Sequence, residues 1–376
     1  MDTEHLDERL AEKALLRYLE TATTDAEDED ALARAIQETL ASAAETFHAD
    51  LMARAPQMLA ERRAERIGFQ ARLYARWREA FDLYEVAWDV AQEAGARFVA
   101  KHQAQAAQEH DVAFGVLTRL HGRACHIASE VYSLLRAGQA TAAMARWRSL
   151  HEVSVVCYLI REHGNRLAQR YLDHEVVESL KALNDYESYR ERLGAEPLEP
   201  GLKQRLQDRL TALSKLAMYG PNFEDDYGWA YEIVGTKKPK IWQLEKLVHL
   251  DHMRPYYRLA SHGVHLNPKG ITFQLEKPYP ENRMVMEGSN AGLADPGQRA
   301  LISLSQCTIT LIASKPDVEV LTTATALLRI VDDACAAFIK VHRQLDAEER
   351  EKRQSHTDRD TPSEVDEQNG ESTSRD

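Results

Sequence analysis

Two short stretches of the sequence hold most of the side chains that could carry out chemistry. The first is MRPYYRLASHGVHLNPKG, residues 253–270. Its residues 253–265 predict a helix that tolerates Pro255 in its first turn. Seven polar side chains are concentrated in this stretch: Tyr256, Tyr257, Arg258, Ser261, His262, His265 and Asn267. Four-residue steps place Tyr257, Ser261 and His265 on one face of that helix. A helix buried in a core does not need this many polar groups, so we expect the stretch to form part of a site.

The second stretch runs from His121 to Glu152 and predicts two antiparallel helices folded about Gly138. Apolar residues recur there at three- and four-residue steps, as on the buried face of a helix. Glycine can take the left-handed conformation that ends a helix. Arg148 and Glu152 are four residues apart and therefore neighbours on one face. They form either a surface ion pair or a buried pair that orders a site, and we expect the second.

Histidine and arginine in the first stretch have the side chains that a metal-independent ribonuclease requires. Such an enzyme needs a group that takes the proton from the 2′-hydroxyl and cations that stabilise charge on the phosphate. The candidate catalytic residues are Arg258 and His265. The candidate residues for binding or for ordering the site are Arg148, Glu152, Tyr257, Ser261, His262 and Asn267. A structural role stays open, in which Arg258 pairs with Glu152 or another buried acid and His265 caps or bridges helices.

Other chemistries lack their usual sequence patterns. His262 and His265 could share a helix face near His121 or Glu152, but Gly263 weakens that helix and neither HExxH nor paired cysteines occur. We therefore expect no metal and no cofactor. The glycine-rich phosphate loop, the dinucleotide-binding GxGxxG and the serine-esterase GxSxG are also missing from the sequence.

Composition indicates a folded protein with charged ends. The chain has 376 residues with 44% hydrophobic content, enough for a substantial core. Residues 1–30 hold eleven acids and three bases, and residues 346–376 hold eleven and five, so the net charge of −13 leaves a body of about +1. No apolar segment follows Met1 and no run of eighteen apolar residues occurs, so we expect no membrane span and a cytoplasmic protein. The cysteines, which we expect to be reduced core residues, are Cys125, Cys157, Cys307 and Cys335.

Helical spacing through most of the chain predicts an all-α protein, a bundle of many helices. Residues 1–110 predict an N-terminal extension of long helices, and residues 111–345 predict a helical core domain. Within the core, residues 271–287 predict a small irregular or β-hairpin insertion around the sequence PYPEN. Residues 346–376 are charged and almost free of apolar side chains, which predicts a disordered acidic tail.

The motif RWRSLHE, preceded by a helix ending LLRAG, and the later YYRLASHGVHLNP resemble a bacterial family catalogued as domain of unknown function 5677, over roughly residues 110–290. The resemblance implies a helical cytoplasmic protein in which Arg148, Glu152, Ser261 and His265 recur. A looser similarity is to the HEPN superfamily, helical bundles that often act as metal-independent ribonucleases and carry an Arg followed, after four to six residues, by a His. Arg258 and His265 have this spacing, but Leu259 stands where those ribonucleases usually have a polar residue.

Two functions follow as alternatives. The first is a HEPN-like, metal-independent ribonuclease in stress or phage defence, which would act on RNA and whose homodimer would bring two copies of His265 into one cleft. The second is a non-enzymatic helical module that binds a small ligand or a protein partner. The residues alone do not decide whether the chain is an enzyme.

Overall fold

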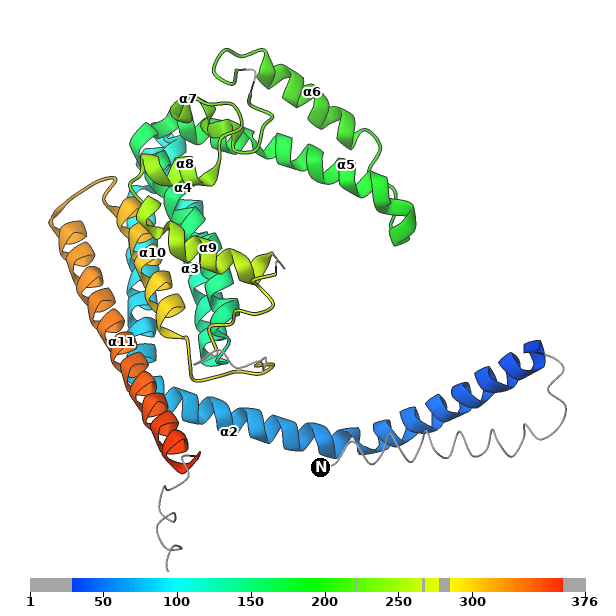
Figure 1. Ribbon diagram of the computed structural model, residues 1–376. Coiled ribbons are helices and arrows are strands. Elements are labelled where there is room, and N and C mark those ends of the chain that lie inside the picture. The colour runs from blue at the N-terminus through cyan, green and yellow to red at the C-terminus, as the bar shows by residue number, and fades with distance from the viewer. Residues whose placement is uncertain (1–28, 221, 266–267, 277–284, 361–376) are drawn as a thin grey trace, which may run out of the picture. The chain divides into compact units, whose positions relative to one another are not determined.

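The computed structural model describes residues 29–220, 222–265, 268–276 and 285–360. The chain divides into two compact units, Met1–Arg72 and Leu73–Asp376. In the described residues every regular element is a helix, which confirms the all-α prediction (Figure 1). The helices are α2 (Glu29–Gln108), α3 (Val112–Arg136), α4 (Ala140–Asp173), α5 (Glu175–Leu193), α6 (Leu202–Ser214), η1 (Gly228–Ala230), α7 (Tyr231–Val234), α8 (Ile241–Leu247), η2 (Asp251–Met253), α9 (Arg254–Val264), α10 (Ala294–Ile312) and α11 (Val318–Asp360).

Helix α2 belongs to both units. We expected the N-terminal extension to end at residue 110, whereas the compact units divide at Arg72. Aromatic side chains in the second part of α2 explain the difference. The rings of Trp77 and Phe81 lie 5.8 and 6.2 Å from the ring of Phe338 in α11, and the Tyr84 hydroxyl donates to the carbonyl oxygen of Ala128 at 2.9 Å. Residues 73–108 are therefore part of the core.

Helices α3 and α4 form the predicted hairpin. The chain turns at Gly138, whose φ of 73° is the left-handed conformation that glycine adopts without strain. Val131 and Leu150 are fully buried on the facing sides of the two helices. Trp147 is also fully buried, and its Nε1 donates to Ser303 of α10 at 3.1 Å. The hairpin and α10 thus form the centre of the second unit.

Helix α11 packs along α10, and the two approach closely at Gly297. A Cβ atom at that position would lie 2.5 Å from the Phe338 ring, so the approach requires glycine. We expected this helix to end near Leu345, but it continues to Asp360. Its charged extension is rich in strong helix formers, and Glu348 accepts from Arg76 at 2.7 Å. The remainder of the expected tail, residues 361–376, lies outside the described residues.

The insertion between α9 and α10 is irregular where the structure describes it, with no strand in residues 268–276 or 285–293. Its buried Glu276 accepts from the backbone N–H of Thr141 at 2.7 Å and from the Thr141 hydroxyl. A carboxylate at this place binds a free N–H at the start of α4 and complements the helix dipole. The insertion is thereby fastened to the helix that carries Arg148. Residues 277–284 of the predicted hairpin lie outside the described residues.

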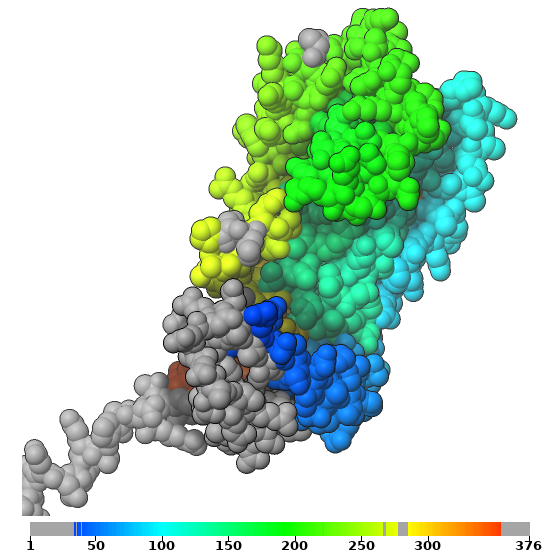
Figure 2. Space-filling model, turned by 90° about the vertical axis from the view of Figure 1, so that its right-hand side faces the viewer, coloured from blue at the N-terminus to red at the C-terminus, as the bar shows by residue number. Residues whose placement is uncertain are grey.

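Helices α5 and α6 lie side by side (Figure 1), and Figure 2 shows the green surface of this part of the chain. The irregular segment after α6 returns to α4, where the fully buried Arg170 donates to the carbonyl oxygens of Met218, Gly228 and Trp229. One side chain therefore sets the path of this segment across the molecule. None of the described helices is long and apolar enough to cross a membrane.

Candidate functional site

The two chemical stretches meet where α9 packs against α4 (Figure 1). Gly263 faces the first turns of α4, and a Cβ atom there would lie 3.2 Å from Cγ2 of Thr141. The missing side chain lets the end of α9 approach α4 closely. As a result, the residue after α9, His265, comes beside residues one to two turns further along α4.

Tyr257 joins the two helices. Its side chain is 4% exposed, and its hydroxyl donates to Oε1 of Glu152 at 2.5 Å. The guanidinium carbon of Arg148 lies 4.6 Å from the centre of its ring, within the range of a cation–π interaction. Burial, followed by the hydrogen bond to Glu152, raises the pKa of Tyr257 well above its ordinary value. The phenol is therefore a stable donor at neutral pH, and it fixes the position of the carboxylate.

Arg148 connects this buried part of the site to solvent. Its Nε donates to Oε1 of Glu152 at 3.3 Å, and its Nη1 lies 3.2 Å from Nε2 of His265, which is exposed. Burial by itself would lower the pKa of Arg148, but Tyr257 and Glu152 outweigh burial and raise it. The guanidinium keeps its charge. Because its N–H groups can only donate, Nε2 of His265 accepts and the imidazole proton is on Nδ1 in this arrangement.

A second polar contact, fully buried, lies beneath the first. Nε2 of His151 is 3.1 Å from Oε1 of Glu245, and both side chains are 0% exposed. Arg254 donates to the other oxygen of Glu245 at 3.1 Å, and its guanidinium carbon lies 4.8 Å from the centre of the Tyr257 ring. The His151 ring contacts the same tyrosine, at 5.9 Å between centres. Tyr257 is therefore the shared neighbour of both charged groups.

Of the residues chosen from the sequence, the structure brings together Arg148, Glu152, Tyr257 and His265. Ser261 is half-buried and donates to the Tyr257 carbonyl at 2.8 Å, a bond within its own helix. His262 is half-buried in the last turn of α9.

The predicted catalytic residue Arg258 lies apart from this group. Arg258 is exposed on α9, and the guanidinium that contacts His265 is that of Arg148. The structure thus places His265 beside an arginine of α4. Asn267 lies outside the described residues.

Sequence reasoning missed Glu245 and Arg254 and did not select His151 as a site residue. The sequence did contain a signal for Glu245. It is an acid between the apolar residues of IWQLEKL, at a position that usually faces a core. His151 likewise continues the buried side of α4 from Trp147. Nδ1 of His151 has no hydrogen-bond partner among the described residues, so its single strong polar contact is Glu245.

Tyr227 is a further aromatic residue near the site. Burial, then the negative charge of Glu152, raises the pKa of Tyr227 to about 12, although Arg148 acts in the opposite direction. Its φ of 56° is uncommon for a bulky residue and is held by the buried segment that follows it. Tyr227 also lines a surface cavity of about 780 Å³ together with Tyr171 and Trp229. Tyr227 therefore links the cavity to the charged site.

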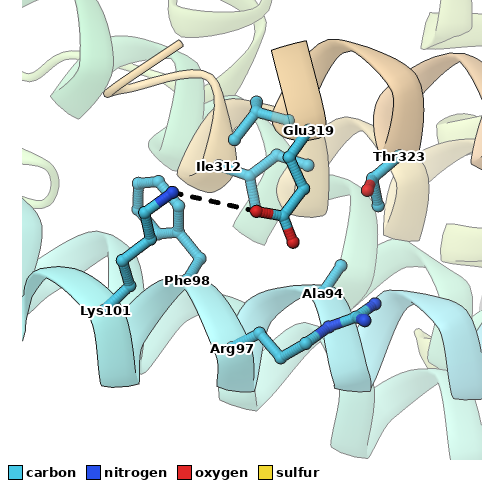
Figure 3. Close-up of a pocket in the computed structure, with 8 residues that line it drawn as sticks. Ala94, Arg97, Phe98, Lys101, Ile312, Glu319 and Thr323 are labelled. Carbon is cyan, nitrogen blue, oxygen red and sulfur yellow. Dashed lines mark ion pairs between the residues drawn. The ribbon is translucent and has the colours of Figure 1, made fainter. Parts of the chain in front are cut away.

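A smaller pocket lies where α2, α10 and α11 meet. Figure 3 shows Lys101 and Glu319 pointing toward one another there, with 3.8 Å between the ammonium nitrogen and a carboxylate oxygen. Lys101 also binds Asp317 at 2.7 Å. The cavity volume is only about 40 Å³, room for a few water molecules. We interpret this pocket as a gap at a helix junction closed by ion pairs. Within the described residues, no group of three or more His, Cys, Asp or Glu side chains could hold a metal ion.

Residues 114–281 match the model of a family of unknown function, DUF5677. The match confirms the resemblance carried by the two motifs, and the DUF5677 region includes all four residues that meet between α4 and α9. No curated protein and no solved structure matches the chain. The chemistry of the DUF5677 region must therefore be inferred from its geometry.

Proposed function

We propose that the chain is a metal-independent ribonuclease that cleaves single-stranded RNA. In this proposal His265 is the general base and Arg148 is the cation that binds the phosphate. The observation that supports this most directly is the 3.2 Å contact between the guanidinium of Arg148 and the exposed imidazole of His265. Glu152 and Tyr257 hold the guanidinium in place, so a phosphate would meet a cation that is already oriented. An exposed histidine beside an oriented cation suits acid–base chemistry on a phosphodiester.

The reaction follows from exchange of partners at Arg148. When a phosphate takes the N–H that now binds His265, Nε2 becomes free to accept the proton of the 2′-hydroxyl. The 2′-oxygen then bonds to phosphorus, and the bond from phosphorus to the 5′-oxygen breaks. The leaving oxygen takes a proton from water, and His265 returns its proton to the hydroxide that remains. The products are a 2′,3′-cyclic phosphate and a free 5′-hydroxyl.

Arg258 has a binding role in this proposal. It is exposed, and it precedes His265 by seven residues, roughly 10 Å along a helix that rises 1.5 Å per residue. An exposed arginine at that distance suits a neighbouring phosphate of the same strand. We therefore expect the loss of Arg258 to weaken RNA binding more than it lowers the rate of cleavage.

The full chain is expected to cut single-stranded RNA in the presence of a chelator and to leave 2′,3′-cyclic phosphate ends. Loss of the general base in His265→Ala should lower the rate about 100-fold or more. Gel analysis of end-labelled RNA with known 3′ ends measures both the rate and the type of product.

Two controls separate this activity from contamination and from misfolding. DNA of the same sequence lacks the 2′-hydroxyl and must stay intact. His252→Ala removes another exposed histidine, which contacts only the carbonyl of His249 in its own turn among the described residues, and should cut as the parent does. No cleavage of varied RNAs by the parent, or equal rates for the parent and His265→Ala, would disprove the ribonuclease proposal.

A second candidate function is supported by the cavity beside the site. Its volume of about 780 Å³ is within the range of small-molecule sites. Three aromatic side chains line it, Tyr171, Tyr227 and Trp229, together with the acids Glu178 and Asp226. Aromatic faces combined with carboxylates favour organic cations. We infer a binding module for a small amine as the non-enzymatic alternative.

Calorimetry with spermidine tests this alternative. Lys181 binds Glu178 at 3.1 Å and Asp226 at 2.8 Å, so an amine would take over those carboxylates. Asp226→Asn should weaken binding roughly tenfold, because one charge-assisted contact is lost. Asp251→Asn, an exposed acid outside the cavity lining, should bind as the parent does. If spermidine produces no heat of binding, or if the dianion succinate binds equally well, the cavity does not select amines.

A further inference from the structure

The first compact unit presents an exposed apolar stripe on α2. In the described part of this unit, Leu40 is 62% exposed, Phe47 36%, Leu51 38% and Met58 38%. These four residues are separated by seven, four and seven positions, so they follow one face of the helix in a heptad-like pattern. A helix in water draws most of its stability from burying such a face against another element. The stripe therefore indicates a partner helix.

The charges on the same helix identify the kind of partner. Residues 29–50 carry five acids and one arginine, a net charge of −4, whereas residues 51–72 carry two acids and five arginines, a net charge of +3. A helix with one acidic and one basic half is complementary to itself in the antiparallel orientation and repels itself in the parallel one.

We propose that residues 29–72 pair with the same segment of a second copy of this chain, as an antiparallel two-helix interface about a twofold axis near residue 49. One register satisfies the apolar stripe, because it places Leu40 opposite Met58 and Phe47 opposite Leu51, each contact occurring twice. The paired segments would be about 66 Å long at 1.5 Å per residue.

Charge argues against residues 1–28 of the same chain as the occupant. They carry nine acids and three bases, a net charge of −6, and they directly precede the acidic half of the helix. Folding back onto residues 29–50 would bring like charges together. The second copy brings opposite charges to both halves.

The mass of the full chain in solution tests the pairing. Multi-angle light scattering should give about 85 kDa at tens of micromolar, twice the 42.6 kDa of one chain. Phe47→Glu with Leu51→Glu should raise the dimer dissociation constant at least about 100-fold, since the central Phe47–Leu51 contact is lost at both of its occurrences and four carboxylates are placed there. A parent that remains at 43 kDa would overturn the proposal. The stripe would then need another occupant, either residues 1–28 or a foreign protein.

Cross-linking distinguishes the orientation. Leu40→Cys and Met58→Cys chains, each in a Cys335→Ser background, should form a disulfide-linked dimer when mixed and oxidised. Neither chain should do so alone, because the two like positions would be roughly 27 Å apart in the antiparallel pair. Cross-linking of each variant with itself would indicate a parallel dimer and disprove the proposed register.

Discussion

Replacing Glu245 with alanine is expected to lower the free energy of unfolding of the second unit by about 3–5 kcal/mol. The substitution removes the carboxylate shared by His151 and Arg254, and His151 has no exposed surface through which water could replace it. Tryptophan fluorescence during urea unfolding measures the loss. All five tryptophans lie after residue 72, so the signal reports the second unit alone.

Glu348→Ala is the matched control, because it removes an exposed acid paired with Arg76. Surface pairs contribute 0–1 kcal/mol, so its unfolding midpoint should stay close to that of the parent. Glu245→Gln keeps the shape of the side chain and one acceptor oxygen. Its unfolding midpoint should therefore lie between those of Glu245→Ala and Glu348→Ala. Equal midpoints for Glu245→Ala and the parent would show that the buried pair contributes no stability.

Arg170→Met should destabilise the second unit by about 3–5 kcal/mol as well, by a different route. The guanidinium is fully buried and donates to Trp229 at 2.7 Å and to Gly228 at 3.0 Å. Methionine fills much of the space but leaves these carbonyl oxygens buried without a donor. Burial lowers the pKa of Arg170, yet the group remains charged at neutral pH, so its donors are always present.

The neighbouring Arg166→Met serves as the control for Arg170. Arg166 is 61% exposed and binds Glu232 at 2.7 Å, so its loss should cost at most about 1 kcal/mol. Arg170→Met should also shift the Trp229 emission to the red as the segment from 218 to 230 loosens, and spermidine binding should weaken in parallel. A stable Arg170→Met protein with unchanged emission would mean that other contacts set the path of this segment.

Much of the fold could be predicted because it depends on local pattern. The α3–α4 hairpin follows from apolar spacing on both sides of Gly138, and α9 follows from Pro255 at its start. Local pattern could not predict that the second part of α2 belongs to the core. That placement depends on Phe338, more than 250 residues further along the chain, which packs against Trp77 and Phe81.

The site was predicted in its membership more than in its pairing. Tyr257 and Glu152 were both chosen, but their hydrogen bond joins residues 105 positions apart. Arg258 was matched with His265 because six residues separate them, as in the HEPN motif. The contact instead comes from Arg148 of α4, which the close approach at Gly263 brings beside His265. The sequence of IWQLEKL could have indicated that Glu245 is buried, but its partners His151 and Arg254 become evident only in three dimensions.

The position of His265 in the chain has a dynamic consequence. The residue follows the last helical residue of α9, with φ −105° and ψ 113°, and its backbone N–H donates to Ser261 at 2.9 Å. Helix ends fray on a submicrosecond timescale, whereas Tyr257, in the first turns, is anchored by burial. Winding and unwinding of one turn would therefore move the imidazole away from Arg148 and back while the cation stays fixed. The fraction of molecules in the reactive state would then depend on how often these four residues are helical. Substitutions at Val264 that change helix propensity would change that fraction without altering any charged group.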